Sequence, residues 1–168
     1  MVKSTKSKIQ KMRRNHPKQI LVPIDFSPAS REALTQALGL AGDTTRIILL
    51  HVIAPSANED LDLSQSIEAA EHKLVQFTKS DGVNAPELIR FEVRTGTLFR
   101  EIIQCAEENE VEMIVLAVHD LSPFGRLSLP HTVDRVSRYA PCPVLLVREQ
   151  DVDLAAKKRN ELRANIAA

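Results

Sequence analysis

Five short apolar runs, separated by segments with helical periodicity, constrain the fold of this 168-residue chain more than any other feature. The runs are short and most are rich in β-branched residues, which is typical of buried strands. They lie at residues 19–25, 46–52, 88–93, 112–118 and 144–147. Because parallel strands require a crossover helix between them, the alternation favours helices on both faces of one sheet. The sequence therefore predicts an α/β fold: a doubly wound, five-stranded, mainly parallel sheet with four helices in a three-layer sandwich.

The segment after the first run carries the clearest local signals. Asp25 ends that run, and Ser27 can cap a helix whose first position is held by Pro28. Pro23 has no N–H to donate to a sheet, so we expect it where the first strand leaves the sheet. In the third run, 88–93, polar and apolar residues alternate, which predicts a strand with one polar face.

Charge divides the chain into a central domain and two tails. The first eighteen residues contain seven Lys and Arg and no acidic residue. Residues 1–17 are therefore interpreted as a basic disordered tail, although such an arm could also contact phosphate backbones or a membrane surface. Residues 18–148 form the expected domain, and 149–168 form a charged C-terminal appendage that could be helical.

Overall charge and hydropathy exclude several classes of protein. Lys plus Arg and Asp plus Glu are balanced at 22 each, so no net field directs the chain to nucleic acid. The N-terminal segment lacks the apolar core of a signal peptide, and no run approaches the length of a membrane span. We therefore expect a cytoplasmic protein without a nucleic-acid or membrane partner.

The reactive residue types show no pattern of a catalytic or metal centre. Cys105 and Cys142 form no C-x-x-C pair and are interpreted as small buried residues in a reducing compartment. Neither His119 nor His131 has a cysteine or carboxylate at metal-ligand spacing, so no metal site is expected. No Ser/His/Asp arrangement with a nucleophile elbow occurs, so no catalytic residue is predicted and an enzyme is not expected, with a weak ATPase left as the alternative.

The segment 112–132 is the expected ligand-binding region. Its apolar run breaks into a loop, and a new helical pattern then opens. A buried strand, a loop and a helix N-terminus in that order form the half-unit where parallel α/β sheets usually bind ligands. His119, Arg126 and His131 could contact an anion there. Gly125 with Arg126 is interpreted as an ordinary surface turn, and a displaced phosphate loop is the alternative.

Six stretches in a fixed order carry a more specific pattern. They are ILVPIDFS at 20–27, ILLHV at 48–52, Gly96 before a helix, MIVL at 113–116, TVDRV at 132–136 and APCPVLLV at 140–147. Together they resemble the universal stress protein family over roughly residues 18–148. The resemblance implies the doubly wound fold described above, a site for an adenine nucleotide, and a dimer in which the last strands pair antiparallel.

The resemblance also assigns residues to the nucleotide site. Asp25 matches the acidic residue at the ribose end, the backbone of Val52 would meet adenine, and Thr132 retains the hydroxyl at the helix N-terminus. Three glycines of the family's phosphate loop fall on Val118, Leu121 and His131, so all three are missing. Side chains there would fill the phosphate space, and a β-branched residue held at positive φ costs about 1–3 kcal/mol. The predicted cofactor-binding residues are Asp25, Val52, Val118, His119, Leu121, His131 and Thr132, with ATP as the candidate ligand.

The leading interpretation is a regulatory or protein-interaction module of the stress response with weakened or absent ATP binding. The alternative is a stress protein that binds an adenine nucleotide through non-glycine backbone geometry. An enzyme of the wider nucleotide-binding α-hydrolase group is the third interpretation, and the chain lacks both an H-x-G-H element and a Ser-Gly-Gly-x-Asp-Ser loop. We also expect an unidentified protein partner and a homodimer through Val144, Leu145, Leu146 and Val147.

Overall fold

The computed structural model describes residues 16–55, 63–79, 88–118 and 131–148. The described residues contain five strands: β1 (Gln19–Pro23), β2 (Arg46–Ile53), β3 (Ile89–Thr95), β4 (Met113–Val118) and β5 (Val144–Arg148). They form one sheet in the order β3-β2-β1-β4-β5, and every neighbouring pair is parallel. Of the two predicted tails, 1–17 and 149–168, the described residues include His16 and Pro17 and nothing more.

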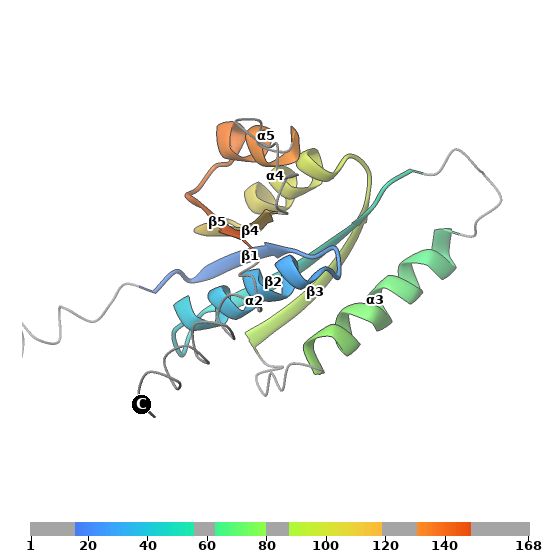
Figure 1. The fold of residues 1–168 in the computed structure, drawn as a ribbon, viewed down its shortest axis with the longest axis horizontal. Helices are drawn as coiled ribbons and strands as arrows, with labels where there is room; N and C mark the ends of the chain where they lie inside the picture. The colour runs from blue at the N-terminus through green and yellow to red at the C-terminus, as the bar shows by residue number, and fades with distance from the viewer. Residues whose placement is uncertain (1–15, 56–62, 80–87, 119–130, 149–168) are drawn as a thin grey trace, which may run out of the picture.

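The four helices of the described residues cover both faces of the sheet (Figure 1). On one face lie α2 (Pro28–Leu40) and α3 (Leu63–Lys79), and on the other lie α4 (Leu98–Glu108) and α5 (His131–Tyr139). The chain first winds outward from β1 to β3 and then returns to the other side of β1. The predicted doubly wound, three-layer sandwich is confirmed, and its strand order changes direction between β1 and β4.

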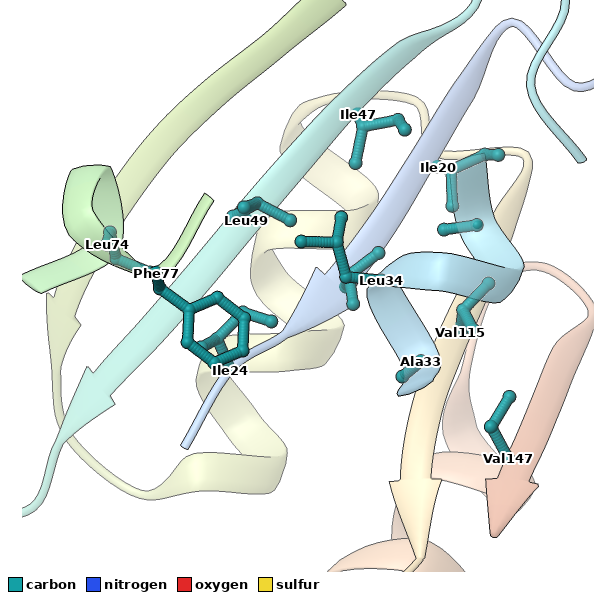
Figure 2. Close-up of a cluster of buried hydrophobic side chains, with 12 residues drawn as sticks. Ile20, Ile24, Ala33, Leu34, Ile47, Leu49, Leu74, Phe77, Val115 and Val147 are labelled. Carbon is teal, nitrogen blue, oxygen red and sulfur yellow. The ribbon is translucent and has the colours of Figure 1, made fainter. Parts of the chain in front are cut away.

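Alternate strand residues fill two cores, one on each face. The α2/α3 core (Figure 2) combines Ile20, Val22, Ile24, Ile47, Leu49 and Val115 of the sheet region with Leu34, Leu74 and Phe77 of the helices. The α4/α5 core combines Leu21, Ile48, Leu50, Ile114, Leu116 and Val118 with Ile102, Val133 and Val136. Because both faces of the three inner strands are buried, their sequences read as nearly continuous apolar runs.

The junction between β1 and α2 forms as its sequence predicts. Pro23 is the last residue of β1 and pairs with Leu50 of β2. Ser27 is the N-cap of α2, and its hydroxyl oxygen accepts a hydrogen bond from the Ser30 backbone N–H at 3.1 Å. Pro28 is the first helical residue, where the missing N–H is not needed.

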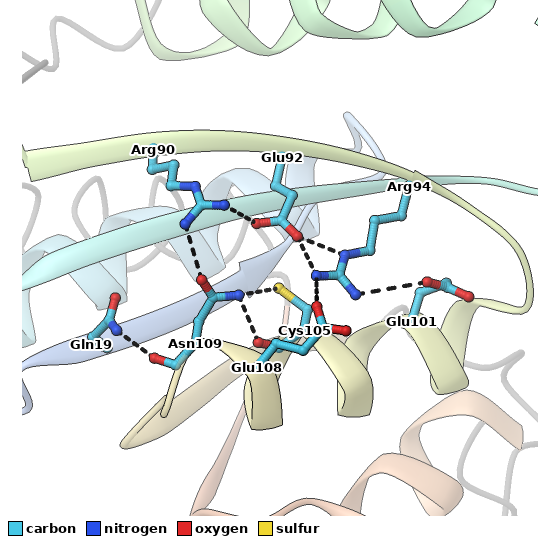
Figure 3. A network of polar contacts seen from close by, with 8 residues as sticks. All are labelled: Gln19, Arg90, Glu92, Arg94, Glu101, Cys105, Glu108 and Asn109. Atoms are coloured by element: carbon cyan, nitrogen blue, oxygen red, sulfur yellow. Dashed lines mark hydrogen bonds and ion pairs between the residues drawn. The ribbon is translucent and has the colours of Figure 1, made fainter.

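Edge strand β3 has the predicted polar face, which packs against α4 (Figure 3). Arg94 donates hydrogen bonds to Glu92 Oε1 and to Glu108 Oε2, each at 2.6 Å. The side chains of Arg94 and Glu92 are 15% and 13% exposed, so this ion pair is largely buried. Arg90 is more exposed, and its Nη2 lies 3.1 Å from Glu92 Oε2. These four residues form the β3–α4 charged network, which takes the place of apolar packing at this edge.

The two cysteines lie in different surroundings. Cys105 is fully buried beneath the β3–α4 charged network, and burial together with the nearby Glu92 carboxylate raises the pKa of its thiol to about 12. Cys142 is partly buried just before β5, and burial raises its pKa as well. Both thiols are free. The predicted role of a small buried residue is confirmed for Cys105 and holds in part for Cys142.

Candidate functional site

A small cavity lies where the strand order changes direction, between the carboxyl ends of β1 and β4 and the first turn of α5. Its volume is about 180 Å³. The lining residues are Pro23, Ile24, Asp25, Leu98, Leu116, Ala117, Thr132 and Val133. Open parallel α/β sheets bind ligands at this place, because the connections on either side diverge to opposite faces of the sheet. We name it the switch-point cavity.

Two of the lining side chains are polar, those of Asp25 and Thr132. Asp25 is exposed, and its Oδ1 accepts hydrogen bonds from the Ser27 backbone N–H at 3.0 Å and from the Ser27 hydroxyl. Since Ser27 caps α2, the Asp25 carboxylate fixes the start of that helix as well as lining the cavity. Thr132 is the second residue of α5, so it lies at a helix N-terminus, where negative charge is favoured.

The turn that follows Asp25 passes through a residue in the left-handed region. Phe26 has a φ of 66°, a conformation that costs a non-glycine residue roughly 1–3 kcal/mol. Its ring lies 4.6 Å from the ring of His51 and 5.8 Å from that of Phe77, measured between centroids. His51 Nδ1 also donates to the Ile24 carbonyl oxygen at 2.8 Å. These contacts hold the end of β1 and the cavity wall in place.

Among the residues predicted for a nucleotide site, the structure brings Asp25 and Thr132 together in the cavity wall. Val52 lies on β2, beyond the residue that pairs with the end of β1, and is partly buried against the α4/α5 core. Val52 is not part of the wall formed by the described residues.

Val118 has a different conformation from the one that the missing glycine implied. It is the last residue of β4, where it is extended and pairs with Arg148 of β5. Its side chain is 6% exposed and belongs to the α4/α5 core. Among the described non-glycine residues, positive φ occurs at Phe26 and Glu110. Val118 thus avoids the strain that a positive φ would impose, because strand pairing and burial keep this valine extended.

The remaining predicted residues lie elsewhere. His131 is the exposed first residue of α5, and it faces a groove between α4 and α5 instead of the cavity. His119 and Leu121 fall outside the described residues, as do Gly125 and Arg126.

The apolar wall of the cavity was not predicted from the sequence. It consists of Pro23, Ile24, Leu98, Leu116, Ala117 and Val133. The residues at the ends of β1 and β4 could have been found, because the point where the strand order reverses determines which strand ends face each other. Leu98 carries no such signal, since it is the first residue of α4 and reaches the cavity from a connection to another strand.

Two features do not occur among the described residues. The described residues contain no group of three or more His, Cys, Asp or Glu side chains that could hold a metal ion. Within the same ranges, none of the helices combines the length and apolar character needed to cross a membrane.

Fold and cavity together define a class of protein: an open, parallel α/β sandwich with a small, mostly apolar site where the strand order reverses. Comparison with known families makes this class specific. The family model described as "Universal stress protein family" matches residues 16–148. The chain belongs to the universal stress protein family.

Individual relatives agree with this assignment. Universal stress protein MJ0531 of Methanocaldococcus jannaschii is 26% identical over 144 residues, which are 79% of this chain and 82% of the relative. The solved structure of universal stress protein UspA from Lactobacillus plantarum has a TM-score of 0.61 and 26% identity, covering 78% of this chain and 97% of that one. A universal stress protein solved in complex with cAMP has a TM-score of 0.60 and 19% identity, covering 81% of this chain and 100% of that one, and shares its fold.

Proposed function

We propose that this chain is a regulatory or protein-interaction member of its family that binds ATP weakly or not at all and has no catalytic role. The observation that carries the proposal is Val118, at the position where the family resemblance expects the first glycine of the phosphate loop. A phosphate-binding loop needs backbone amides that turn toward the ligand, which glycine allows. Val118 instead continues β4, and its side chain is committed to the α4/α5 core.

The size and polarity of the switch-point cavity support the same proposal. Ligand pockets usually have volumes of about 300–1,000 Å³. The cavity formed by the described residues has about 180 Å³, and six of its eight lining residues are apolar. It could accept a small apolar group that also hydrogen-bonds to Asp25 or Thr132, and a triphosphate would find few donors among these residues.

Nucleotide binding is the second candidate, and specific observations favour it. Asp25 and Thr132, which the resemblance assigns to the two ends of a nucleotide, share one cavity. The N-terminus of α5 offers free amides and a partial positive charge to an anion. A fold relative has been solved with cAMP. A mononucleotide carries fewer phosphates than ATP, so it would depend less on the phosphate loop whose three glycines are missing.

Two measurements distinguish these candidates. Denaturation and chromatography of the purified protein should release no stoichiometric adenine nucleotide, and titration calorimetry with Mg-ATP should give a Kd in the high micromolar range or weaker.

A variant with glycine at positions 118, 121 and 131 should gain affinity for ATP if the missing glycines cause the loss. Val118→Ala is the matched control, since it removes core volume without the freedom of glycine. Low-micromolar ATP binding by the native chain would refute the proposal.

A further inference from the structure

We propose that the groove between α4 and α5 binds an acidic, aromatic-containing segment of a partner protein. The groove has a volume of about 570 Å³ and shares no lining residue with the switch-point cavity. Three arginines line it against one aspartate: Arg100, Arg135 and Arg138 against Asp134. The proposal does not depend on whether the cavity binds a nucleotide.

Two of these arginines converge on one aromatic ring. The Arg135 Cζ lies 4.5 Å from the centroid of the Phe99 ring, and the Arg100 Cζ lies 5.8 Å from the same centroid. A guanidinium over an aromatic ring gains a cation–π attraction and leaves its N–H groups available at the edges of its plane. Both guanidinium groups therefore lie against the same ring, and both line the groove.

Neither Arg100 nor Arg135 takes part in an ion pair found in the part of the chain that the structure describes. An anion bound in the groove would be attracted by both guanidinium groups. A carboxylate suits this position, since its two oxygens match the N–H fork of a guanidinium.

The other end of the groove is lined by an exposed aromatic residue, Tyr139, and by an arginine that is already paired, Arg138. Tyr139, at the end of α5, is 65% exposed and offers a large apolar surface with a hydroxyl at its edge. Arg138 is already paired with Asp134, with 3.0 Å between Nε and Oδ1. Acidic residues of a ligand are thus favoured near Phe99, and an aromatic or aliphatic residue is favoured near Tyr139.

A protein segment fits this arrangement better than a nucleic acid. The whole chain has a formal net charge of zero, whereas a polyanionic backbone needs a long basic surface to release its counterions. Along α5 the groove runs from His131 to Tyr139, on the order of 12 Å at 1.5 Å per helical residue. That length accommodates a few residues of an extended peptide.

The test uses a short fluorescein-labelled peptide of alternating glutamate and phenylalanine, titrated with the full chain by fluorescence anisotropy. Arg135→Ala and Arg100→Ala should each weaken binding by about tenfold, the scale of one strong interface residue. Arg135→Lys should recover part of the loss, because it keeps the charge without the planar fork. Arg46→Ala is the matched control: Arg46 is exposed and begins β2, away from the groove, so affinity should not change.

Two ligand controls make the result decisive. The same peptide with glutamine for glutamate should bind at least several-fold more weakly, and a labelled single-stranded oligonucleotide should bind less tightly than the acidic peptide. Equal affinity for the glutamine peptide, tighter binding of the oligonucleotide, or a loss in Arg46→Ala as large as in Arg135→Ala would each overturn the proposal. Coinciding thermal unfolding curves of the variants and the native chain would show that the losses do not come from unfolding.

Discussion

The two edge strands of the sheet, β3 and β5, differ in how their side chains are covered. On β3 the polar face is covered by α4, and its charges are matched within the chain by the β3–α4 charged network. On β5, Leu145 and Leu146 are each 37% exposed. Inward-pointing charges are one of the devices that stop an edge strand from pairing, whereas an apolar edge strand favours it. We therefore propose that β5 is the edge that pairs with a second copy of the chain, in a homodimer through Val144, Leu145, Leu146 and Val147.

The largest effect is expected at the β3 edge, from Arg94→Ala. This change leaves the Glu92 carboxylate buried without its main counter-ion, which should destabilise the fold by about 3–5 kcal/mol. Urea unfolding measures the loss. Arg90→Ala is the matched control, because the Arg90 side chain is 63% exposed and its removal should cost about 0–1 kcal/mol. If the two variants lost equal free energy of unfolding, the Arg94–Glu92 ion pair would not behave as a buried one.

At the β5 edge, proline substitutions can separate folding from dimerisation. The Ile114 N–H donates to the Pro143 carbonyl oxygen at 3.0 Å, and in a parallel ladder this turns the Leu145 N–H toward β4 and the Leu146 N–H toward the open side. Leu145→Pro should remove a bond within the sheet and destabilise the fold by about 1–3 kcal/mol. Leu146→Pro should leave folding nearly intact and produce monomers.

Light scattering and thermal unfolding of both variants measure these outcomes. A native chain that is monomeric at all concentrations, or a Leu146→Pro variant that stays dimeric, would reject β5 as the interface.

The same contrast explains how much of the fold was predictable from the sequence. The inner strands are apolar on both faces, so the apolar runs at 19–25 and 112–118 identified β1 and β4 to within a few residues. Strand β3 was expected at 88–93 and extends to Thr95. Its end is set by pairing of Thr95 with Ile53, a contact between distant residues that local alternation does not reveal.

The candidate site was predicted in part for the same reason. The family resemblance assigned Asp25 and Thr132 to a nucleotide site, and both line the switch-point cavity, while their binding of a ligand stays a prediction. Val118 closes the apolar run at 112–118 and is extended as that run predicts, whereas the residue count from the family's loop gave only the place of a missing glycine. In this chain the pairing of Val118 with Arg148 decides where β4 ends. The stacking of Arg135 on Phe99 joins two helices and leaves no trace in the periodicity of either.

The cysteines near the two edges should differ in reactivity. The pKa of about 12 keeps the Cys105 thiol almost fully protonated at pH 8, so iodoacetamide should not modify it in the folded protein. Cys142 is partly buried and should react first. Mass spectrometry after timed alkylation measures both sites. Rapid modification of Cys105 under native conditions would show that α4 opens from the β3 edge.

This thiol also has a consequence for stability at high pH. The folded chain keeps the Cys105 proton up to about pH 12, while an unfolded thiol loses it near its ordinary value of 9.0. The unfolded state therefore binds fewer protons above that value, and stability falls as pH rises from about 9 toward 12. Cys105→Ala should reduce this decline while costing some packing energy at neutral pH, which denaturant unfolding at several pH values can separate.

The smallest effect is expected at the outer rim of the charged network, from Glu108→Gln. Hydrogen bonds from Gln104 and from Arg94 lower the pKa of the Glu108 carboxyl below its ordinary value of 4.5, so the ionised form favours folding. That contribution is present above pH 4.5 and is lost as pH falls through the lowered pKa of the folded state. Glu108 is exposed and solvent screens it, so the difference between native and Glu108→Gln should be small at neutral pH, shrink with added salt and vanish in acid. Arg94 keeps its bond to the buried Glu92 in this variant. If Glu108→Gln lost as much free energy of unfolding as Arg94→Ala, the β3–α4 charged network would depend on its exposed residue Glu108. The charges of the β3 edge would then not be matched mainly by buried ion pairs.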